Sequence, residues 1–513
     1  MSDSNTFLGD LPELSYEIIN YLKNDFSTLY SCILVNRLWC RLAIPLLWKN
    51  PFSNPTRNYS FIEIYLNNLN DDFKTKLNEY EIINISLFSK NIMFNYLKFL
   101  RYLNIEKFIS SVEQWLADVA SINTKSLYNS EQDFKDFRSL VLMSLFKIFI
   151  ENEVNLDTLE IKTSSTNYNS DILELILKNQ NFIHNVKNLK LHIDDNNDCK
   201  IIYNRITQII HLHQNLKKIL IVGANNYTSL YLSLLLSKDY NCSNTLNTII
   251  FYCVIFKSIN NLDKVLEQLN VLESVHIFYC SFLDSNFTQQ IINLTKPFKL
   301  KSLFHIYETP QIETVQQLLQ KSGDYLENFG FIYNASLNQQ LLKYCKNIKF
   351  FYFLINESSF TYQLINLIEN IKQSLSCLSI ILRNNHSTNC SSFILQNLGQ
   401  ILPSKLDYLS LDLNIKKNDF RVFLENSQYI LINKLIIAQS GSDDILHYIK
   451  EHIMKEKRVK YLAIKNFRTS KELFNLKDEV KEFDIHNIKV RSYDDLVISV
   501  HSLSNSPFLE IGQ

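Results

Sequence analysis

One apolar pattern, L-x-x-L-x-L with any apolar residue allowed at its three anchors, most constrains what this chain can fold into. Thirteen instances recur at a mean spacing of about 27 residues. They begin at Leu156, Val186, Leu216, Leu246, Leu272, Leu300, Leu326, Ile348, Leu375, Leu406, Ile432, Val459 and Val480. Each triad has the period of a β-strand, which favours one strand per repeat. Repetition at a fixed period predicts a solenoid, in which each unit buries its apolar face against its neighbours.

The segments between the triads favour helices, because their apolar residues lie three and four apart. The expected helices cover residues 171–177, 201–210, 262–269, 312–319, 362–371 and 393–402. The clearest repeat begins at Leu272 and continues through Val275, Ile277 and Cys280, and it resembles a leucine-rich repeat. That resemblance implies an α/β horseshoe over residues 151–495, with about 13 repeats, strands on the concave face and helices outside. Armadillo and HEAT arrays are purely helical and would lack such triads, and thirteen regular instances argue against chance.

The first fifty residues form a separate unit, residues 8–52. Pro12 marks the start of a first helix, Asp25 and Asn36 are expected N-caps of a second and a third, and Pro51 is expected to end the third. A core of three short helices is marginal alone. We therefore expect this unit to depend on a partner or on the rest of the chain.

The same residues resemble the F-box. The resemblance is carried by Leu11-Pro12, Ile18-Ile19, Leu22, the run Leu34-Val35-Asn36-Arg37-Leu38-Trp39, Ala43 and Leu47-Trp48. The first helix is one residue short, and Asn36-Arg37 replaces the commoner cysteine-arginine step. The F-box family implies docking onto the Skp-type adaptor of a cullin–RING ubiquitin ligase, and the positions carried over for that contact are Leu11, Pro12, Ile18, Leu22, Val35 and Trp39. Alternatively, these side chains only fill the three-helix core.

Residues 53–150 are interpreted as a helical bridge that includes an irregular capping region. Helices are expected around residues 93–102, 112–120 (capped by Ser110) and 137–150, and an early strand is expected at residues 82–87. Thr469-x-x-Glu472 has the pattern of a further capping box, and residues 496–513 are expected to form a tail.

The composition excludes several functions. The chain has 52 basic and 52 acidic side chains, which argues against nucleic acid or an anionic membrane as its main partner. It has only 7 glycines, and neither a phosphate-binding loop nor a nucleophile elbow is present. Its nine cysteines include no CxxC pair, and no signal peptide is recognised at the N-terminus. A cytoplasmic or nuclear protein with reduced thiols is therefore expected.

No metal site, cofactor or catalytic residue is predicted. The pairs His211 with His213 and His447 with His452 have poor zinc spacing, and both are expected to be solvated. The acidic stretch at residues 194–198 lacks the glutamate of a calcium loop, and the basic run at residues 455–458 is interrupted by an acid.

A stripe of large apolar side chains is predicted on the concave face, at positions that need not be apolar. It comprises Tyr252, Phe278, Phe304, Ile306, Ile332, Tyr352, Leu354 and Ile381. Contiguous apolar surface usually marks a contact site, so the stripe is the expected partner-binding surface. Two alternatives are open: another segment covers the stripe, or a register slip places it in the core.

The expected function is that of a non-catalytic substrate receptor of an SCF-type ubiquitin ligase. The F-box would bind the adaptor, in complex with the cullin scaffold, and the solenoid would hold an unknown target protein. The alternative is a protein-interaction scaffold that binds the adaptor without promoting degradation. A catalytic solenoid is disfavoured because the enzyme motifs are absent.

Overall fold

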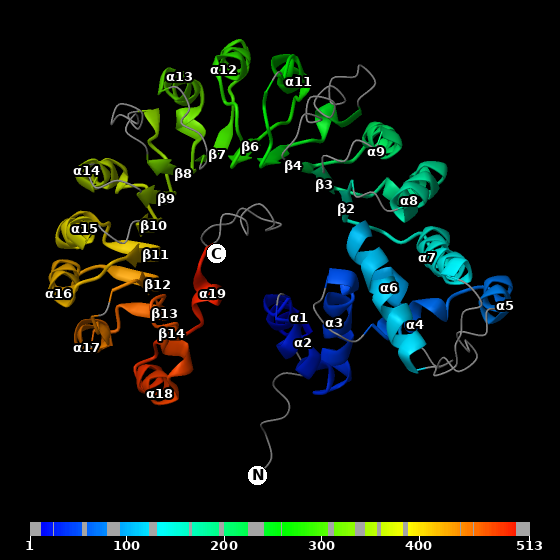
Figure 1. Ribbon diagram of the computed structural model, residues 1–513, viewed down its shortest axis with the longest axis horizontal. Helices are drawn as coiled ribbons and strands as arrows, with labels where there is room; N and C mark the ends of the chain where they lie inside the picture. Colours follow the sequence, from blue (N-terminus) through cyan, green and yellow to red (C-terminus); the bar gives the residue numbers. More distant parts are fainter. Residues whose placement is uncertain are drawn as a thin grey trace. The chain divides into compact units, whose positions relative to one another are not determined.

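The computed structural model, drawn in Figure 1, describes most of the chain. The described residues are 12–23, 25–53, 59–79, 93–122, 131–163, 167–193, 200–223, 241–257, 259–305, 312–333, 344–355, 361–382, 388–441, 443–454 and 456–498. They fall into two compact units. Unit 1 comprises Met1–Val222 and Ser237–Leu246, and unit 2 comprises Gly223–Leu236 and Asn247–Gln513.

Unit 1 begins with three helices, α1 (Pro12–Tyr21), α2 (Phe26–Ile33) and α3 (Arg37–Leu47). Both predicted N-caps are confirmed. The Asp25 carboxylate accepts the Thr28 backbone N–H at 3.0 Å, and the Asn36 side chain accepts that of Trp39 at 2.9 Å. The third helix ends at Leu47, before Pro51, so the expected stop signal does not set its end.

The rest of unit 1 alternates helices and strands. The elements are α4 (Phe61–Leu66), α5 (Asp71–Glu79), β1 (Tyr102–Asn104), α6 (Ile105–Ile122), α7 (Glu131–Glu151), β2 (Thr158–Lys162), α8 (Asn167–Lys178), β3 (Asn188–Ile193), α9 (Lys200–Leu212) and β4 (Lys218–Gly223). Helices were correctly expected around residues 112–120 and 137–150. The early strand expected at residues 82–87 lies outside the described residues.

Strand β1 corrects the interpretation of residues 93–102 as helical. Only a single 3₁₀ turn, Tyr96–Phe99, precedes this strand, which pairs in parallel with β2. The repeat pattern itself fits here, with anchors Leu100, Leu103 and Ile105. Helix α6 then begins at Ile105, where the Asn104 side chain accepts the Lys107 N–H at 2.8 Å, so Ser110 is not its cap.

Unit 2 continues the alternation of strand and helix. Its elements are β5 (Thr248–Tyr252), α11 (Leu262–Gln268), β6 (Ser274–Phe278), α12 (Ser285–Ile292), β7 (Leu300–His305), α13 (Ile312–Ser322), β8 (Asn328–Tyr333), β9 (Phe350–Ile355), α14 (Thr361–Ile371), β10 (Cys377–Leu382), α15 (Thr388–Ile401), β11 (Lys405–Leu413), α16 (Lys417–Asn426), β12 (Leu431–Gln439), α17 (Leu446–Ile449), β13 (Val459–Asn466), β14 (Lys471–Glu472), α18 (Lys477–Ile485), β15 (Lys489–Val490) and α19 (Tyr493–Leu496).

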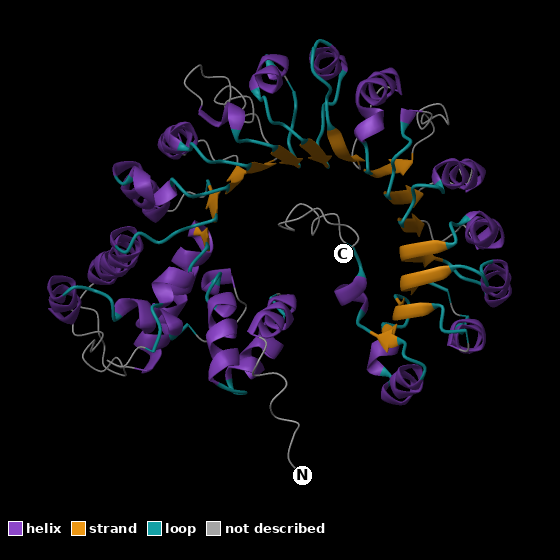
Figure 2. Ribbon diagram, turned by 180° about the vertical axis from the view of Figure 1, so that it is seen from behind, coloured by secondary structure: helices purple, strands orange, loops and turns teal. Residues whose placement is uncertain are grey.

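Within each unit the strands follow one another across the sheet in sequence order. Pairs from β5 to β13 are parallel, and in unit 2 helices α11 to α17 lie together on one side of them (Figures 1 and 2). A buried row runs through the sheet on the helix side and contains Ile277, Leu303, Phe329, Phe351, Leu378, Leu409, Leu435 and Leu462. The face opposite the helices is the predicted concave face. The predicted α/β solenoid is confirmed at this level.

Two local predictions fail at the end of the array. The triad that begins at Val480 lies in helix α18, and the strand of this last repeat is β15, which pairs with β13. Thr469 precedes the short strand β14 instead of capping a helix. Apolar residues three apart fit both a triad and a helix face, which is why the pattern misled at Val480.

The register also slips once inside unit 2. Val275 pairs with Leu300 while His276 pairs with Ser302, so Lys301 is an extra residue in β7. Leu303 pairs with Ile277, so the triad that begins at Leu300 is displaced by two residues from the strand register, and Phe278 lies opposite Phe304 instead of Ile306. A bulge of this kind is invisible to a fixed template because it changes pairing without changing residue type.

Candidate binding surfaces

The N-terminal helices α1–α3 have a small core. Ile19, Leu29, Cys32 and Ala43 are buried, and Leu22 and Trp39 pack against them with other half-buried side chains. Leu22 and Trp39 therefore serve this core, as the alternative interpretation of the F-box residues expected. Pro12 is the first residue of α1, and Leu11 lies outside the described residues.

Helices α1 and α2 and the turn after α2 carry several exposed apolar side chains, which together we call the apolar patch. Ile18 is 37 % exposed, Val35 is 58 % exposed and Leu34 is 79 % exposed. The other members are Leu14, Tyr16, Tyr21, Phe26 and Tyr30. So many exposed large apolar groups within residues 14–35 make this unit a candidate contact surface.

The three helices are fixed to the solenoid by packing and by backbone hydrogen bonds. The centroid of the Trp48 ring lies 4.2 Å from the centroid of the Tyr96 ring and 5.5 Å from the centroid of the Tyr65 ring. The Lys49 carbonyl accepts the N–H groups of Arg101 and Tyr102 at 3.0 and 3.1 Å. In the same way, the carbonyls of Arg101, Asp157 and Lys187 each accept two backbone N–H groups from the start of the next repeat. The Lys49 carbonyl is therefore the first acceptor in a series that runs through unit 1.

The predicted apolar stripe of unit 2 is largely inaccessible. Phe278, Phe304 and Leu354 are buried, whereas Tyr252, Tyr352 and Ile381 are half-buried. Ile332 lies in β8, and Ile306 lies outside the described residues. The expectation of an open apolar surface is wrong for the three buried residues, which agrees with the alternatives of a covered or slipped stripe. A partner-binding role for the others stays a prediction.

Part of the stripe forms an aromatic row across neighbouring strands, and a glycine occupies one position of this row. Phe304 stacks on Phe278 at 5.3 Å and lies 6.3 Å from Tyr352. Gly330 lies between Phe304 and Tyr352 in the sheet register, and a Cβ atom there would lie 2.5 Å from the Phe304 ring. The missing side chain thus makes the space that the Phe304 ring occupies.

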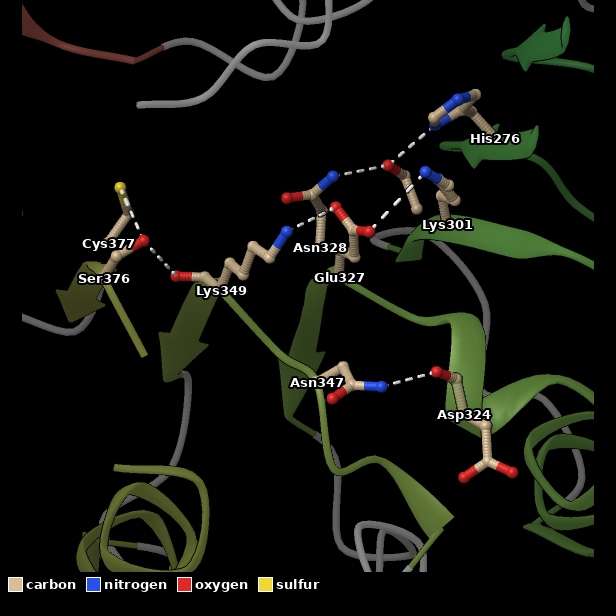
Figure 3. Close-up of polar contacts among 10 residues, drawn as sticks. His276, Lys301, Asp324, Glu327, Asn328, Asn347, Lys349, Ser376 and Cys377 are labelled. Atoms are coloured by element: carbon tan, nitrogen blue, oxygen red, sulfur yellow. Dashed lines mark hydrogen bonds and ion pairs between the residues drawn. The ribbon is translucent and has the colours of Figure 1, made fainter. Parts of the chain in front are cut away.

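A polar row lies on the same face of the sheet as the aromatic row, two residues earlier in each strand. The Ser302 hydroxyl lies 2.8 Å from Nδ1 of His276 and accepts an N–H of the Asn328 amide at 2.9 Å. All three side chains are buried. At the edge of the same strands, Glu327 lies 3.6 Å from Lys301 and 3.2 Å from Lys349 (Figure 3). The contacts of Ser302 satisfy buried polar groups, and both sets of contacts join neighbouring strands to one another.

The C-terminal residues 491–498 lie on the concave face, away from α16–α18 (Figure 1). The segment begins beside β13, where the Arg491 N–H donates to the Leu462 carbonyl, and ends where the Ile498 N–H donates at 3.0 Å to the Tyr408 hydroxyl on β11. Lys465 lies 3.6 Å from Asp494. The segment therefore covers the concave face of β11–β13.

Two side chains that were expected to be exposed to solvent, one histidine and one arginine of the basic run, are buried. His213 is fully buried instead of solvated, and Arg458 is buried with its guanidinium donating to the Ser427 and His452 carbonyls. His447 is exposed as expected. Among the described residues, no three or more His, Cys, Asp or Glu side chains are placed to hold a metal ion. The acidic stretch at residues 194–198 lies outside the described residues.

Comparisons with known proteins add little. No protein-family model matches the chain, and no curated protein matches it. A crystal structure of a TLR13–ssRNA13 complex matches with 14 % identity and a TM-score of 0.31, covering 61 % of this chain and 39 % of that chain. A score that low carries no argument. The strand order and the repeat define the class by themselves: this is a leucine-rich-repeat-like α/β solenoid. Within the described residues, no helix has the length and apolar character needed to cross a membrane.

Proposed function

We propose that this chain is the substrate-recognition subunit of an SCF-type cullin–RING ubiquitin ligase in the cytoplasm or nucleus. Its N-terminal helices dock onto a Skp-type adaptor, and its solenoid holds a target protein. The chain itself performs no catalysis. Its contribution is to hold a target lysine at high effective concentration near the ligase.

The observation that supports this proposal most is the apolar patch. Of the residues that the F-box resemblance assigns to the adaptor, Ile18 and Val35 are exposed in this patch. Side chains that only filled the core would not be exposed in this way. Apolar side chains held on a small helical unit can be buried by a partner, which supplies the area that the unit lacks alone.

The attachment of the patch to the solenoid also supports the proposal. Lys49 and Trp48 connect the three helices to β1, so a partner on the patch is held at a fixed position relative to the first repeats of unit 1. A receptor needs such rigidity because positioning is its only contribution to ubiquitin transfer.

Co-purification tests the first half of the proposal. The full chain should recover a Skp-type adaptor and a cullin from cells, and Val35→Asp should lose both. Ile201→Asp is a matched control, because Ile201 on α9 is, like Val35, an exposed β-branched apolar side chain of unit 1. Recovery of the adaptor by Val35→Asp would contradict the proposal.

The alternative is a scaffold that binds the adaptor without promoting degradation. The stability of co-purified proteins separates the two functions. A protein captured by the solenoid should persist longer in cells that carry Val35→Asp than in cells that carry the native chain. Equal lifetimes would favour the scaffold.

A further inference from the structure

A cavity of about 430 Å³ lies in unit 2, where strands β11, β12 and β13 begin. Its volume falls within the range of about 300–1,000 Å³ that is usual for ligand sites. Leu406, Ile432 and Val459, the first anchors of three successive repeats, line the cavity and are buried. Leu431 also lines it but is 57 % exposed. The cavity therefore offers a large aliphatic side chain against which an apolar group of a partner can pack.

The rest of the lining is largely cationic. Lys405 is the first residue of β11, and Lys457 and Lys460 lie on either side of the first residue of β13. These three residues, the cavity lysines, all line the cavity and are exposed. Arg458 is already neutralised, because its Nε lies 2.8 Å from a carboxylate oxygen of Glu456. Among the described residues that line the cavity, one aspartate faces three lysines.

The cavity lysines lack the carboxylate partner that lysines have earlier in the same sheet. Near the starts of β7, β8 and β9, Glu327 lies 3.6 Å from Lys301 and 3.2 Å from Lys349, so one carboxylate serves both ammonium groups (Figure 3). Within the part of unit 2 that the structure describes, none of the cavity lysines forms an ion pair. The Lys460 ammonium lies 5.3 Å from the centroid of the Tyr461 ring, a contact that leaves its charge uncompensated.

Positive charge beside an exposed aliphatic side chain fits an acidic segment that carries a large apolar residue. Its carboxylates would pair with the ammonium groups, and its apolar side chain would be buried against Leu431. The Asn433 and Asn487 amides also line the cavity and can donate to the same carboxylates. We propose that this cavity is the docking site for such a segment of the target protein. The inference rests on the proposed role of the solenoid as the target-binding part, and not on docking of the adaptor.

The test measures fluorescence anisotropy of three labelled peptides of equal length with the full chain. The first peptide has a leucine between two pairs of glutamates, the second has glutamines in place of the glutamates, and the third has alanine in place of the leucine. The first should bind, the second should bind at least about tenfold more weakly, and the third should have an intermediate affinity. Binding of the first peptide should weaken as salt is raised, because the cavity lysines are exposed.

Variants of the cavity lysines locate the binding. Lys405→Met and Lys460→Met should each weaken binding of the first peptide about fivefold, the upper end for one exposed ion pair. Methionine keeps the aliphatic part of the side chain, and both lysines are exposed, so thermal melting should show folded proteins. Lys264→Met is the matched control, because Lys264 is an exposed lysine of the same unit on α11, outside the cavity, and it should not affect binding.

Leu431→Ala tests the apolar half of the site. It should weaken binding of the leucine peptide about fivefold and leave binding of the alanine peptide nearly unchanged, because only the leucine side chain loses a contact. Leu431 is exposed, so its truncation should leave the protein folded. Equal weakening of both peptides would overturn the assignment of Leu431 as the apolar contact.

Three further outcomes would overturn the inference: the glutamine peptide binds as tightly as the first, neither of them binds, or the methionine variants bind the first peptide with native affinity. Tighter binding of a single-stranded oligonucleotide than of the first peptide would overturn the assignment to a protein segment. Adaptor binding measured on the same variants should be unchanged. Failure of this inference is therefore distinguishable from failure of the proposed function.

Discussion

At the scale of single residues, His213 makes stability depend on pH. Burial lowers the pKa of its imidazole to about 4, and a backbone contact with Ile183 offsets this only in part. The ordinary value is about 6.5. The neutral ring is therefore favoured in the folded protein, and the unfolded chain takes up the proton first as the pH falls.

Stability should consequently fall between about pH 6.5 and pH 4, by about 3 kcal/mol from this residue, and level off below that range. Above pH 6.5 the residue contributes no pH dependence. Urea unfolding at a series of pH values checks this, with His213→Leu expected to show a shallower fall. His447→Leu is the control because His447 is exposed, and a His213→Leu profile parallel to the native one would refute the account.

Gly330 is the second residue whose role can be measured. Alanine there would place its Cβ atom 2.5 Å from the Phe304 ring, so Gly330→Ala should cost about 1–3 kcal/mol of unfolding free energy. Phe304→Leu alone should also destabilise the protein, because it leaves a cavity. In the double variant the two costs should partly cancel, since the smaller side chain leaves room for the new methyl group. Strictly additive costs would show that the ring does not occupy this space.

At the scale of elements, the repeat pattern predicted most strands and helices because each repeat is stabilised by contacts that the local sequence encodes. The same pattern, applied at Leu100, would have found β1. It failed at Val480, where spacing by three residues fits a strand triad and a helix equally. Asp25 and Asn36 were predictable as caps because capping depends on residues three apart.

The candidate surfaces were harder to predict than the fold. The extra residue Lys301 changes which side chains lie opposite one another, and no residue type in the sequence indicates its position. Residues 491–498 cover β11–β13 through a hydrogen bond from Ile498 to Tyr408, which is 90 residues away in sequence. The exposure of Ile18 and Val35 was not derivable from periodicity, and only the F-box resemblance singled these residues out.

The C-terminal segment 491–498 gives a prediction at this scale. Tyr408→Phe removes the hydroxyl that accepts the Ile498 N–H, at a cost of about 1 kcal/mol to local closure. Hydrogen exchange at Ile498 should become roughly fivefold faster, while exchange in β6 and β7 stays unchanged. Tyr461→Phe, on strand β13 of the same sheet, serves as the control. Unchanged exchange at Ile498 in Tyr408→Phe would mean that other contacts hold the segment.

At the scale of the whole molecule, the proposed function places its two activities in different parts of the chain: adaptor binding in the apolar patch and target binding in the solenoid. Substitutions in the patch should therefore leave the thermal stability of the solenoid nearly unchanged, because Ile18 and Val35 do not belong to its core.

Calorimetric titration of the purified full chain with a Skp-type adaptor tests the central claim most directly. We predict that Ile18→Asp and Val35→Asp each weaken binding at least about tenfold, because a charge would be buried in an apolar interface, and that Ile201→Asp binds like the native chain. Native affinity in both patch variants, or no binding by the native chain, would contradict the claim that these helices dock onto the adaptor.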